Sequence, residues 1–168
     1  IPQVQWPQDA QIAVSVVVNY EEGSEYSLLD GDDHHETNGE VPSPVPPQQR
    51  DLYNESFFEY GSRVGVWRLL NLLDKYQVPA TFFCCALALE RNLEVAHEIP
   101  ARGHEVCGHG YRWEEYHLME REAERQAIAQ TVASLTQTTG QRPLGWWTRY
   151  APSVHTRELI VEEGGFLY

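Results

Sequence analysis

The sequence predicts an α/β fold in which parallel β-strands alternate with helices along the chain. Two compact apolar runs, residues 12–19 and 80–87, are too short to be typical helices and have the composition of buried strands. Residues 56–77 and 119–139 instead carry apolar side chains at helical spacing. Because the alternation continues to the end of the chain, we expect right-handed crossovers between parallel strands, in an open sheet or part of a barrel.

The first strand is expected at residues 12–19, where β-branched side chains dominate, and it runs directly into Glu21 and Glu22. Residues 24–54 follow without clear periodicity and contain a proline-rich stretch. Loops longer than about 12–15 residues are usually functional or disordered. This segment is therefore expected to be a long loop insertion on the active-site side of the domain.

The next helix is expected to begin at a capping box made by Ser56 and Glu59, and to end near Gln77 before a proline. The remaining elements alternate in the same way. They are a strand at 80–87, a helix from Asn92 to about Ile99, a strand at 104–108, a helix at 119–139, a short strand at 144–147, a helix capped by Ser153 and stopped by Gly164, and a fifth strand beginning at Phe166.

Composition and charge exclude some classes of function. Of 168 residues, 42% are hydrophobic and 22% are charged, which is typical of one globular domain. The 12 basic and 25 acidic residues give a formal charge of −13, which repels phosphate backbones and anionic lipid surfaces. No apolar run approaches the roughly 20 residues needed to span a bilayer. We therefore expect neither a nucleic acid nor a membrane as a partner.

Cysteine use and the start of the chain predict a cytoplasmic protein. The first residues show no basic region followed by an apolar one, so no signal peptide is expected. The three cysteines, Cys84, Cys85 and Cys107, are an odd number and do not form the pattern of a disulfide framework or a Cys-x-x-Cys zinc site. Buried free thiols of a reduced protein are the expected interpretation.

Polar side chains follow several predicted strands at the carboxyl end, where sites of parallel α/β folds lie. Glu21 and Glu22 point to opposite faces of a strand, so both reach one site only where the backbone turns, which Gly23 permits. One carboxylate can take a proton from water while the second holds a cation or orients a substrate. The alternative is a pair of solvated acids.

His109, flanked by two glycines, ends the third predicted strand. It is either a ligand or acid of a site or a structural histidine bonded to the backbone. Arg112 offers a planar fork of donors for a carbonyl or ureido group.

Aromatic residues and a second group of histidines complete the candidates. Trp146 and Trp147 either bound a ring-shaped ligand or pack in the core. His34 and His35 lie in an acidic loop without EF-hand spacing, so a solvated loop is expected there rather than a cation site.

Six short motifs occur in order along nearly the whole chain: NYEEG at 19–23, EYGSR at 59–63, PATFF at 79–83, GHGYRW at 108–113, TGQRPLGW at 139–146 and EEGGFLY at 162–168. In this order they resemble the polysaccharide deacetylase family, also called the NodB homology family. The resemblance is greatest to its branch of cofactor-independent allantoinases of purine breakdown. It implies a distorted (β/α) barrel of the NodB type, in agreement with the alternation of strands and helices.

The resemblance implies a hydrolase of non-peptide C–N bonds in a cyclic amide, converting allantoin to allantoate. Metal-dependent family members carry two aspartates at the first strand end, one a base and one a metal ligand, and Glu21 and Glu22 stand in those places. For the allantoinase branch we expect Glu21 as general base and His109 as donor to the oxyanion or leaving nitrogen. The expected substrate-binding residues are Glu22, Arg112, Trp113 and Trp146.

Departures from the family pattern argue against a metal. The metal-dependent members carry His-x-x-x-His, of which His109 matches the first position while Trp113 stands at the second. Trp146 falls about where the arginine of their third motif is expected, so this arginine is expected to be missing. Only Glu22 and His109 remain as ligands for a divalent metal such as zinc, whereas catalytic zinc usually has three. No cofactor is therefore expected, although a metal-dependent deacetylase of N-acetyl sugars or peptidoglycan is the alternative.

The family domain continues beyond the motif at 162–168. The resemblance therefore implies that residues 1–168 form a single NodB-like domain with the N-terminal five strands of an incomplete barrel. An exposed sheet edge and uncovered apolar surface are expected consequences. A further alternative is a catalytically incomplete fragment that binds a small molecule or a partner. The allantoinase branch also implies a homo-oligomer that acts on a neutral small molecule.

Overall fold

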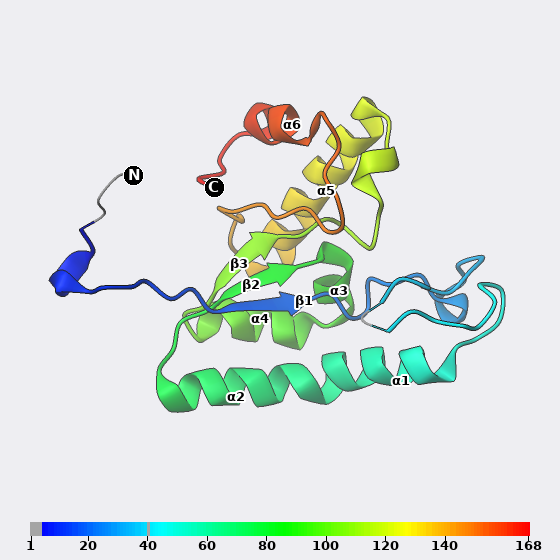
Figure 1. Ribbon diagram of the computed structural model, residues 1–168, viewed down its shortest axis with the longest axis horizontal. Helices are drawn as coiled ribbons and strands as arrows, with labels where there is room; N and C mark the ends of the chain where they lie inside the picture. The colour runs from blue at the N-terminus through cyan, green and yellow to red at the C-terminus, as the bar shows by residue number, and fades with distance from the viewer. Residues whose placement is uncertain (1–4, 40) are drawn as a thin grey trace.

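Three parallel strands form an open sheet at the centre of the computed structural model, which describes residues 5–39 and 41–168 (Figure 1). The strands β1 (Val17–Tyr20), β2 (Thr81–Cys84) and β3 (Glu105–Gly108) lie in the order β1-β2-β3. Helices occupy both crossovers, so each strand runs parallel to its neighbour. The α/β class predicted from the sequence is confirmed.

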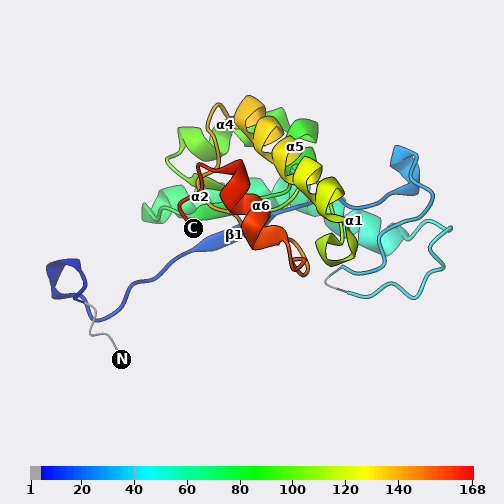
Figure 2. The same ribbon diagram turned by 90° about the horizontal axis from the view of Figure 1, so that it is seen from above.

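Six α-helices surround the sheet in the described part of the chain, and none is long and apolar enough to cross a membrane. Leu70, Phe82, Ile99 and Leu135 from four different elements meet in one buried cluster, which fixes these helices against the strands. The six helices are α1 (Leu52–Tyr60), α2 (Val66–Tyr76), α3 (Ala86–Arg91), α4 (Leu93–Ala101), α5 (Arg121–Thr139) and α6 (Thr156–Glu163). Short 3₁₀ turns lie at Pro7–Asp9, Leu28–Asp30 and Tyr116–Leu118. Helices α5 and α6 pack against each other around a second cluster (Figure 2).

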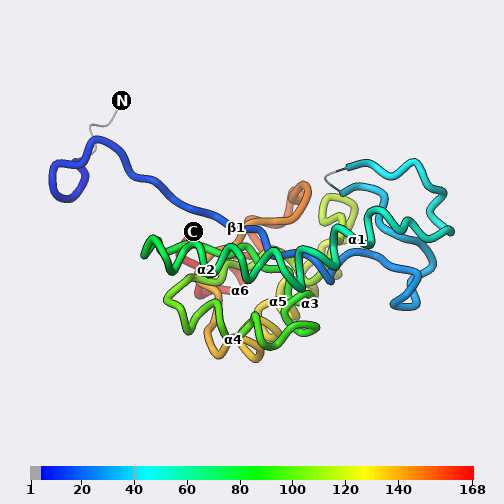
Figure 3. The backbone as a smooth tube through the Cα atoms, turned by 90° about the horizontal axis from the view of Figure 1, so that it is seen from below, coloured from blue at the N-terminus to red at the C-terminus, as the bar shows by residue number. Residues whose placement is uncertain are grey.

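Helices α1 and α2 form one long rod that is interrupted by a π-helical turn, Gly61–Gly65 (Figure 3). The backbone remains in the right-handed helical region on both sides of the turn, at Gly61 and at Val66, so the rod does not break. Such turns are rare and occur frequently at functional sites. Val66, Leu70 and Leu73 of α2 are buried, whereas α1 buries only Asn54. Helix α2 therefore packs against the apolar core, whereas most of α1 is not buried.

Helix α1 begins earlier than the sequence pattern predicts. The side chain of Asp51 accepts hydrogen bonds from the backbone N–H groups of Tyr53 and Asn54, and it also accepts one from Ser43 Oγ at 2.5 Å. Ser56 lies inside the helix, where its hydroxyl donates to the carbonyl of Tyr53. The predicted capping box at Ser56 and Glu59 is wrong, because Asp51 already satisfies the free N–H groups.

The ends of two other elements also differ from the prediction. The first strand begins at Val17 rather than residue 12, and the segment before it extends away from the body, with Ile12 and Val14 exposed. The second strand ends at Cys84, and the chain enters α3, which the sequence pattern did not predict. Asn92 caps α4 as expected.

The prediction of five strands is wrong for the described residues. The fourth is reduced to a single bridge between Gly108 and Trp146, and the segment from Phe166 forms no regular strand. Two backbone hydrogen bonds join this segment to residues 144–146. The backbone of β3 comes close to the side chain of Trp146 at Gly108. A Cβ atom at this position would lie 2.7 Å from the indole ring, so the close contact requires glycine.

Helix α6 begins after a turn rather than at a Ser153 cap. Ser153 Oγ accepts from the N–H of His155, and both Ser153 and Thr156 donate their hydroxyls to the carboxylate of Glu124, which is fully buried on α5. Gly164 ends the helix as predicted, with a positive φ of 74° that favours glycine.

Replacing Asp51 by alanine is expected to lower the free energy of unfolding by about 1 kcal/mol, because two N–H groups of α1 lose their acceptor. The matched variant Ser56→Ala is expected to change it by less than about 0.5 kcal/mol. Urea unfolding of both variants measures the difference. A larger loss for Ser56→Ala would place the start of the helix where the sequence pattern predicted it.

Candidate functional site

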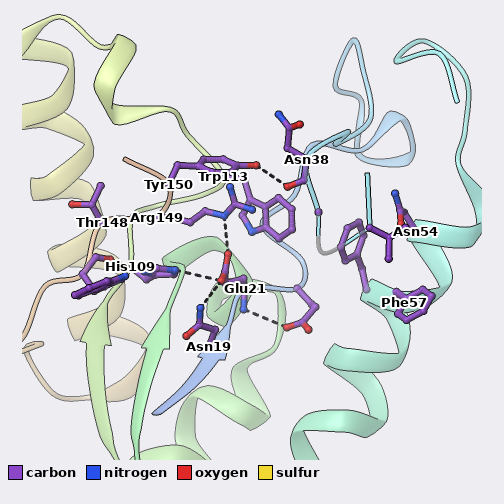
Figure 4. A pocket seen from close by; sticks show the side chains of 15 residues that line it. Asn19, Glu21, Asn38, Asn54, Phe57, His109, Trp113, Thr148, Arg149 and Tyr150 are labelled. Carbon is purple, nitrogen blue, oxygen red and sulfur yellow. Dashed lines mark hydrogen bonds and ion pairs between the residues drawn. The ribbon is translucent and has the colours of Figure 1, made fainter. Parts of the chain in front are cut away.

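A pocket with a volume of about 550 Å³ lies beyond the carboxyl ends of the strands (Figure 4). Five segments that are distant in sequence contribute to it, as the parallel topology predicts. The lining residues are Asn19, Glu21, Glu22, Asn38, Gly39, Val41, Asn54, Phe57, Phe58, His109, Trp113, Trp147, Thr148, Arg149 and Tyr150.

Glu21 lies at the centre of a hydrogen-bond network in this pocket. Its Oε1 accepts from Asn19 Nδ2 at 3.0 Å and lies 3.3 Å from His109 Nε2, while its Oε2 accepts from Arg149 Nε at 2.7 Å. The turn after β1 presents this side chain, and Gly23 adopts the φ of +102° that the turn requires. Burial raises the pKa of Glu21, but His109 and Arg149 outweigh burial and lower it to about 2. The carboxylate is therefore ionised at neutral pH.

His109 is buried and uses both ring nitrogens within the protein. Its Nδ1 lies 2.5 Å from the carbonyl of Trp147. Because a carbonyl only accepts, Nδ1 is assigned as protonated, and Nε2 is turned to Glu21. The two interpretations left open by the sequence are combined here, since one nitrogen bonds the backbone and the other faces the pocket carboxylate. His109 is thus a partner of Glu21, and its predicted role as a donor to a ligand stays a prediction.

Arg149 was not found from any motif or pattern in the sequence. Its guanidinium is stacked between two rings, with Cζ 3.5 Å from the centroids of both Trp113 and Tyr150. Tyr150 takes a positive φ of 58°, a conformation that non-glycine residues adopt at a cost. The predicted absence of an arginine near Trp146 is corrected, because Arg149, three residues further along the chain, binds Glu21. Its place just after a predicted strand end is the signal that could have indicated it.

Glu22 lines the same pocket as predicted and lies against the π-helical turn. Its Oε2 accepts from the backbone N–H of Glu21 at 3.3 Å. A Cβ atom at Gly61 would overlap the Glu22 carboxylate, so any other residue there would force the Glu22 side chain to shift.

Arg112 lies outside the pocket, contrary to its predicted role in substrate binding. Its two terminal nitrogens bind Asp32 at 3.0 and 2.8 Å, one of them also donates to the carbonyl of Glu25, and the guanidinium lies over the ring of Tyr26. Its donors are therefore used to hold the loop that begins at Ser24.

Trp146 also lies outside the pocket, and Trp147 lines it instead. The indole of Trp146 packs against Tyr116 and Phe166, and its Nε1 donates to Thr148 Oγ1 at 3.0 Å. The structure places Trp147 rather than Trp146 at the pocket wall, while substrate binding by either ring stays a prediction. Trp113 does line the pocket, where its ring meets Phe58 edge to face.

The family is shown by comparison with known proteins. Residues 55–165, more than half of the chain, match the family model described as polysaccharide deacetylase. The chain belongs to the polysaccharide deacetylase family. It is 40% identical over 163 residues to a Schizosaccharomyces pombe protein assigned as a polysaccharide deacetylase, a match that covers 94% of this chain and 50% of the relative.

Two solved structures of this family have similar folds. The chain is 42% identical to Puue allantoinase, with a TM-score of 0.87, and 45% identical to a Pseudomonas aeruginosa protein described as a probable polysaccharide deacetylase, with a TM-score of 0.90. Each match covers 100% of this chain and 56% of the other. The chain thus spans about half the length of the relatives it matches.

The described residues place the two predicted metal ligands, Glu22 and His109, in the pocket, whereas a catalytic zinc usually has three. Among residues 5–39 and 41–168, no group of three or more histidine, cysteine, aspartate or glutamate side chains is placed to hold an ion. Of the two candidate ligands, His109 turns its Nε2 to Glu21 and bonds the backbone with its Nδ1, and an indole stands at position 113. In the acidic loop, His35 is buried and bonded to the carbonyls of Glu36 and Val45, so the solvated position expected for it is wrong.

The network around Glu21 predicts a pH-dependent contribution to stability. Because the folded pKa of about 2 lies below the ordinary value of 4.5, ionised Glu21 stabilises the fold by about 3 kcal/mol above pH 4.5 and loses this contribution as pH falls toward 2. Glu21→Gln is therefore expected to have a lower melting temperature than the parent at pH 7, and the two values should converge between pH 4.5 and 2. A constant difference across this range would contradict the ion-pair assignment.

Proposed function

We propose that the protein hydrolyses a C–N bond in a cyclic amide, such as the hydantoin ring of allantoin, to give allantoate. The observation that carries the proposal is the Glu21 carboxylate, held by Asn19, His109 and Arg149 in the pocket beyond the carboxyl ends of the strands. The similarity to Puue allantoinase over the whole chain supports the same substrate class.

Glu21 is the proposed general base. Each carboxylate oxygen can accept two hydrogen bonds, and Oε2 accepts one, from Arg149, among the described residues, which leaves it able to hold a water molecule. As the water oxygen attacks the ring carbonyl carbon, its proton moves to Glu21. The ring C–N bond then breaks and the proton passes to the leaving nitrogen, which restores the carboxylate.

The low pKa of Glu21 has two effects on this chemistry. It keeps the carboxylate ionised at neutral pH, but it also makes it a weak base. Proton transfer is therefore expected to be concerted with attack, as negative charge builds on the carbonyl oxygen. The buried guanidinium of Arg149 stabilises negative charge nearby, and preorganised donors of this kind contribute strongly in sites that exclude water.

A metal-dependent deacetylase is the second candidate, and the relatives support it. A Helicobacter pylori protein named peptidoglycan deacetylase is 34% identical over 109 residues, covering 62% of this chain and 36% of that protein. This candidate requires an ion bound through Glu22 and His109. Both ring nitrogens of His109 already face protein groups, the carbonyl of Trp147 and the carboxylate of Glu21, which disfavours this candidate. A third candidate is a fragment that only binds a small molecule or partner. The homo-oligomer implied by the resemblance and the cytoplasmic location indicated by the cysteines and the start of the chain remain predictions.

Incubation of the full-length protein with allantoin is expected to yield allantoate, and treatment with a chelator is expected to leave the rate unchanged. Glu21→Gln is expected to lower kcat at least about 100-fold, because general base catalysis typically contributes this much. The exposed Glu59→Gln on α1 is the matched control and should retain the parental rate.

Three outcomes would contradict the proposal. Release of acetate from an N-acetyl sugar with a chelator-sensitive rate, in the absence of allantoin turnover, would favour the deacetylase. Binding without any turnover would favour the third candidate. A fully active Glu21→Gln variant that remains folded would remove Glu21 as the base.

A further inference from the structure

Two neighbouring N–H groups at the pocket have no hydrogen-bond partner. They are Nε1 of Trp113 and Nη1 of Arg149, on residues that are only 6% and 7% exposed. Nearly all buried polar groups in folded proteins are paired, because an unpaired one loses its hydration without replacement. A third such group, Nδ2 of Asn54, belongs to α1 on the other side of the pocket (Figure 4). These three unpaired atoms are all on residues that line the pocket.

Trp113 and Arg149 form one unit whose position is fixed from several directions. The guanidinium carbon lies 3.5 Å from the centroid of the indole ring, and Arg149 Nε holds Glu21. The backbone N–H of Trp113 donates to the carbonyl of Ser24 at 3.2 Å. Both unpaired groups therefore stand close to the proposed general base, in a geometry that the protein already maintains.

The chemistry of the two groups defines what they can bind. An indole nitrogen and a guanidinium only donate hydrogen bonds, so each needs an acceptor from the ligand. Glu21 and Glu22 in the same pocket are acceptors for N–H groups of a ligand. A ring whose edge alternates C=O with N–H offers acceptors to the two donor groups and donors to the two carboxylates. A sugar hydroxyl both donates and accepts, so it would fit either kind of group without selectivity.

We propose that Trp113 Nε1 and Arg149 Nη1 are the specificity-determining donors of this pocket, and that they bind the carbonyl oxygens of a cyclic ureide. The inference rests on the proposed function and identifies the residues that select its substrate. Trp113 stands where metal-dependent relatives are expected to carry their second histidine ligand. Its indole thus supplies a hydrogen bond to a carbonyl at the place where those enzymes use an ion.

Ligand binding requires a local adjustment. Both nitrogens are closed off from water in the structure, so a carbonyl reaches them only when neighbouring side chains turn. Tyr150 covers one face of the guanidinium, and its hydroxyl donates to the carbonyl of Asn38 at 3.1 Å. A change in the surroundings of Trp113 on binding is expected to appear in its fluorescence.

Calorimetric titration of the full-length protein with hydantoin tests the proposal. Trp113→Phe removes the N–H and keeps an aromatic ring, and it is expected to weaken hydantoin binding and kcat/KM for allantoin about tenfold, the value of one hydrogen bond. Trp67→Phe, in the half-buried part of α2 away from the pocket, is the matched control and should match the parent. Equal values for the two variants would overturn the proposal.

A comparison of ligands keeps the test independent of folding. Dithiohydantoin retains the ring and its N–H groups but replaces both carbonyl oxygens by sulfur, a poor acceptor, so the parent protein should bind it more weakly than hydantoin. Equal affinity would overturn the donor assignment. Trp113-dependent hydantoin binding without allantoin hydrolysis would refute the proposed function alone, whereas hydrolysis unaffected by Trp113→Phe would refute this inference alone.

Discussion

The ion pair between Glu21 and Arg149 joins parts of the chain that are 128 residues apart, and the pocket depends on it. Glu21 follows the first strand, and Arg149 follows the bridge that Trp146 makes with the third. A buried charge without a partner is strongly destabilising, so each side chain requires the other. His109 completes the arrangement from the end of β3 and is itself held by the carbonyl of Trp147. The ends of the outer strands are thus connected by charge and hydrogen bonds as well as by apolar packing.

Much of the sheet and its helices could be predicted because their signals are local. Strand cores are compact apolar runs, Asn92 caps a helix with its own side chain, and Gly164 ends one with a backbone conformation that favours glycine. The start of α1 could not be predicted in this way. Asp51 and Ser56 are both good caps, and the contact that accompanies the choice of Asp51 comes from Ser43 in the loop.

The candidate site was also predictable only in part, because its long-range contacts leave no signal in the local sequence. The strand ends at Glu21 and His109 follow from topology. Arg112 and Arg149 are both arginines near strand ends, and they are distinguished by Asp32 and Glu21, partners 80 and 128 residues away. Trp146 packs against Tyr116 and Trp147 stacks on Phe83, so a one-residue error in the bridge exchanges their roles. Arg112 and Trp113 are neighbours, so the residue that holds the loop lies next to one that lines the pocket.

The π-helical turn between α1 and α2 has a consequence for how this pocket tolerates insertions and deletions. Each residue of an α-helix advances the side-chain direction by about 100°. A π-helical turn holds one residue more than an α-helical turn, so loss of one residue within Gly61–Gly65 would restore regular winding and leave the direction of α1 relative to α2 almost unchanged. Loss of a residue between Phe58 and Leu70 but outside this turn would instead rotate α1 by about 100° relative to α2, which is fixed by Leu70 and Leu73 in the core. Asn54, Phe57 and Phe58 would then turn away from the pocket. One wall of the site is therefore set by helical register, and the π-helical turn is the place where the rod can lose a residue without altering that wall.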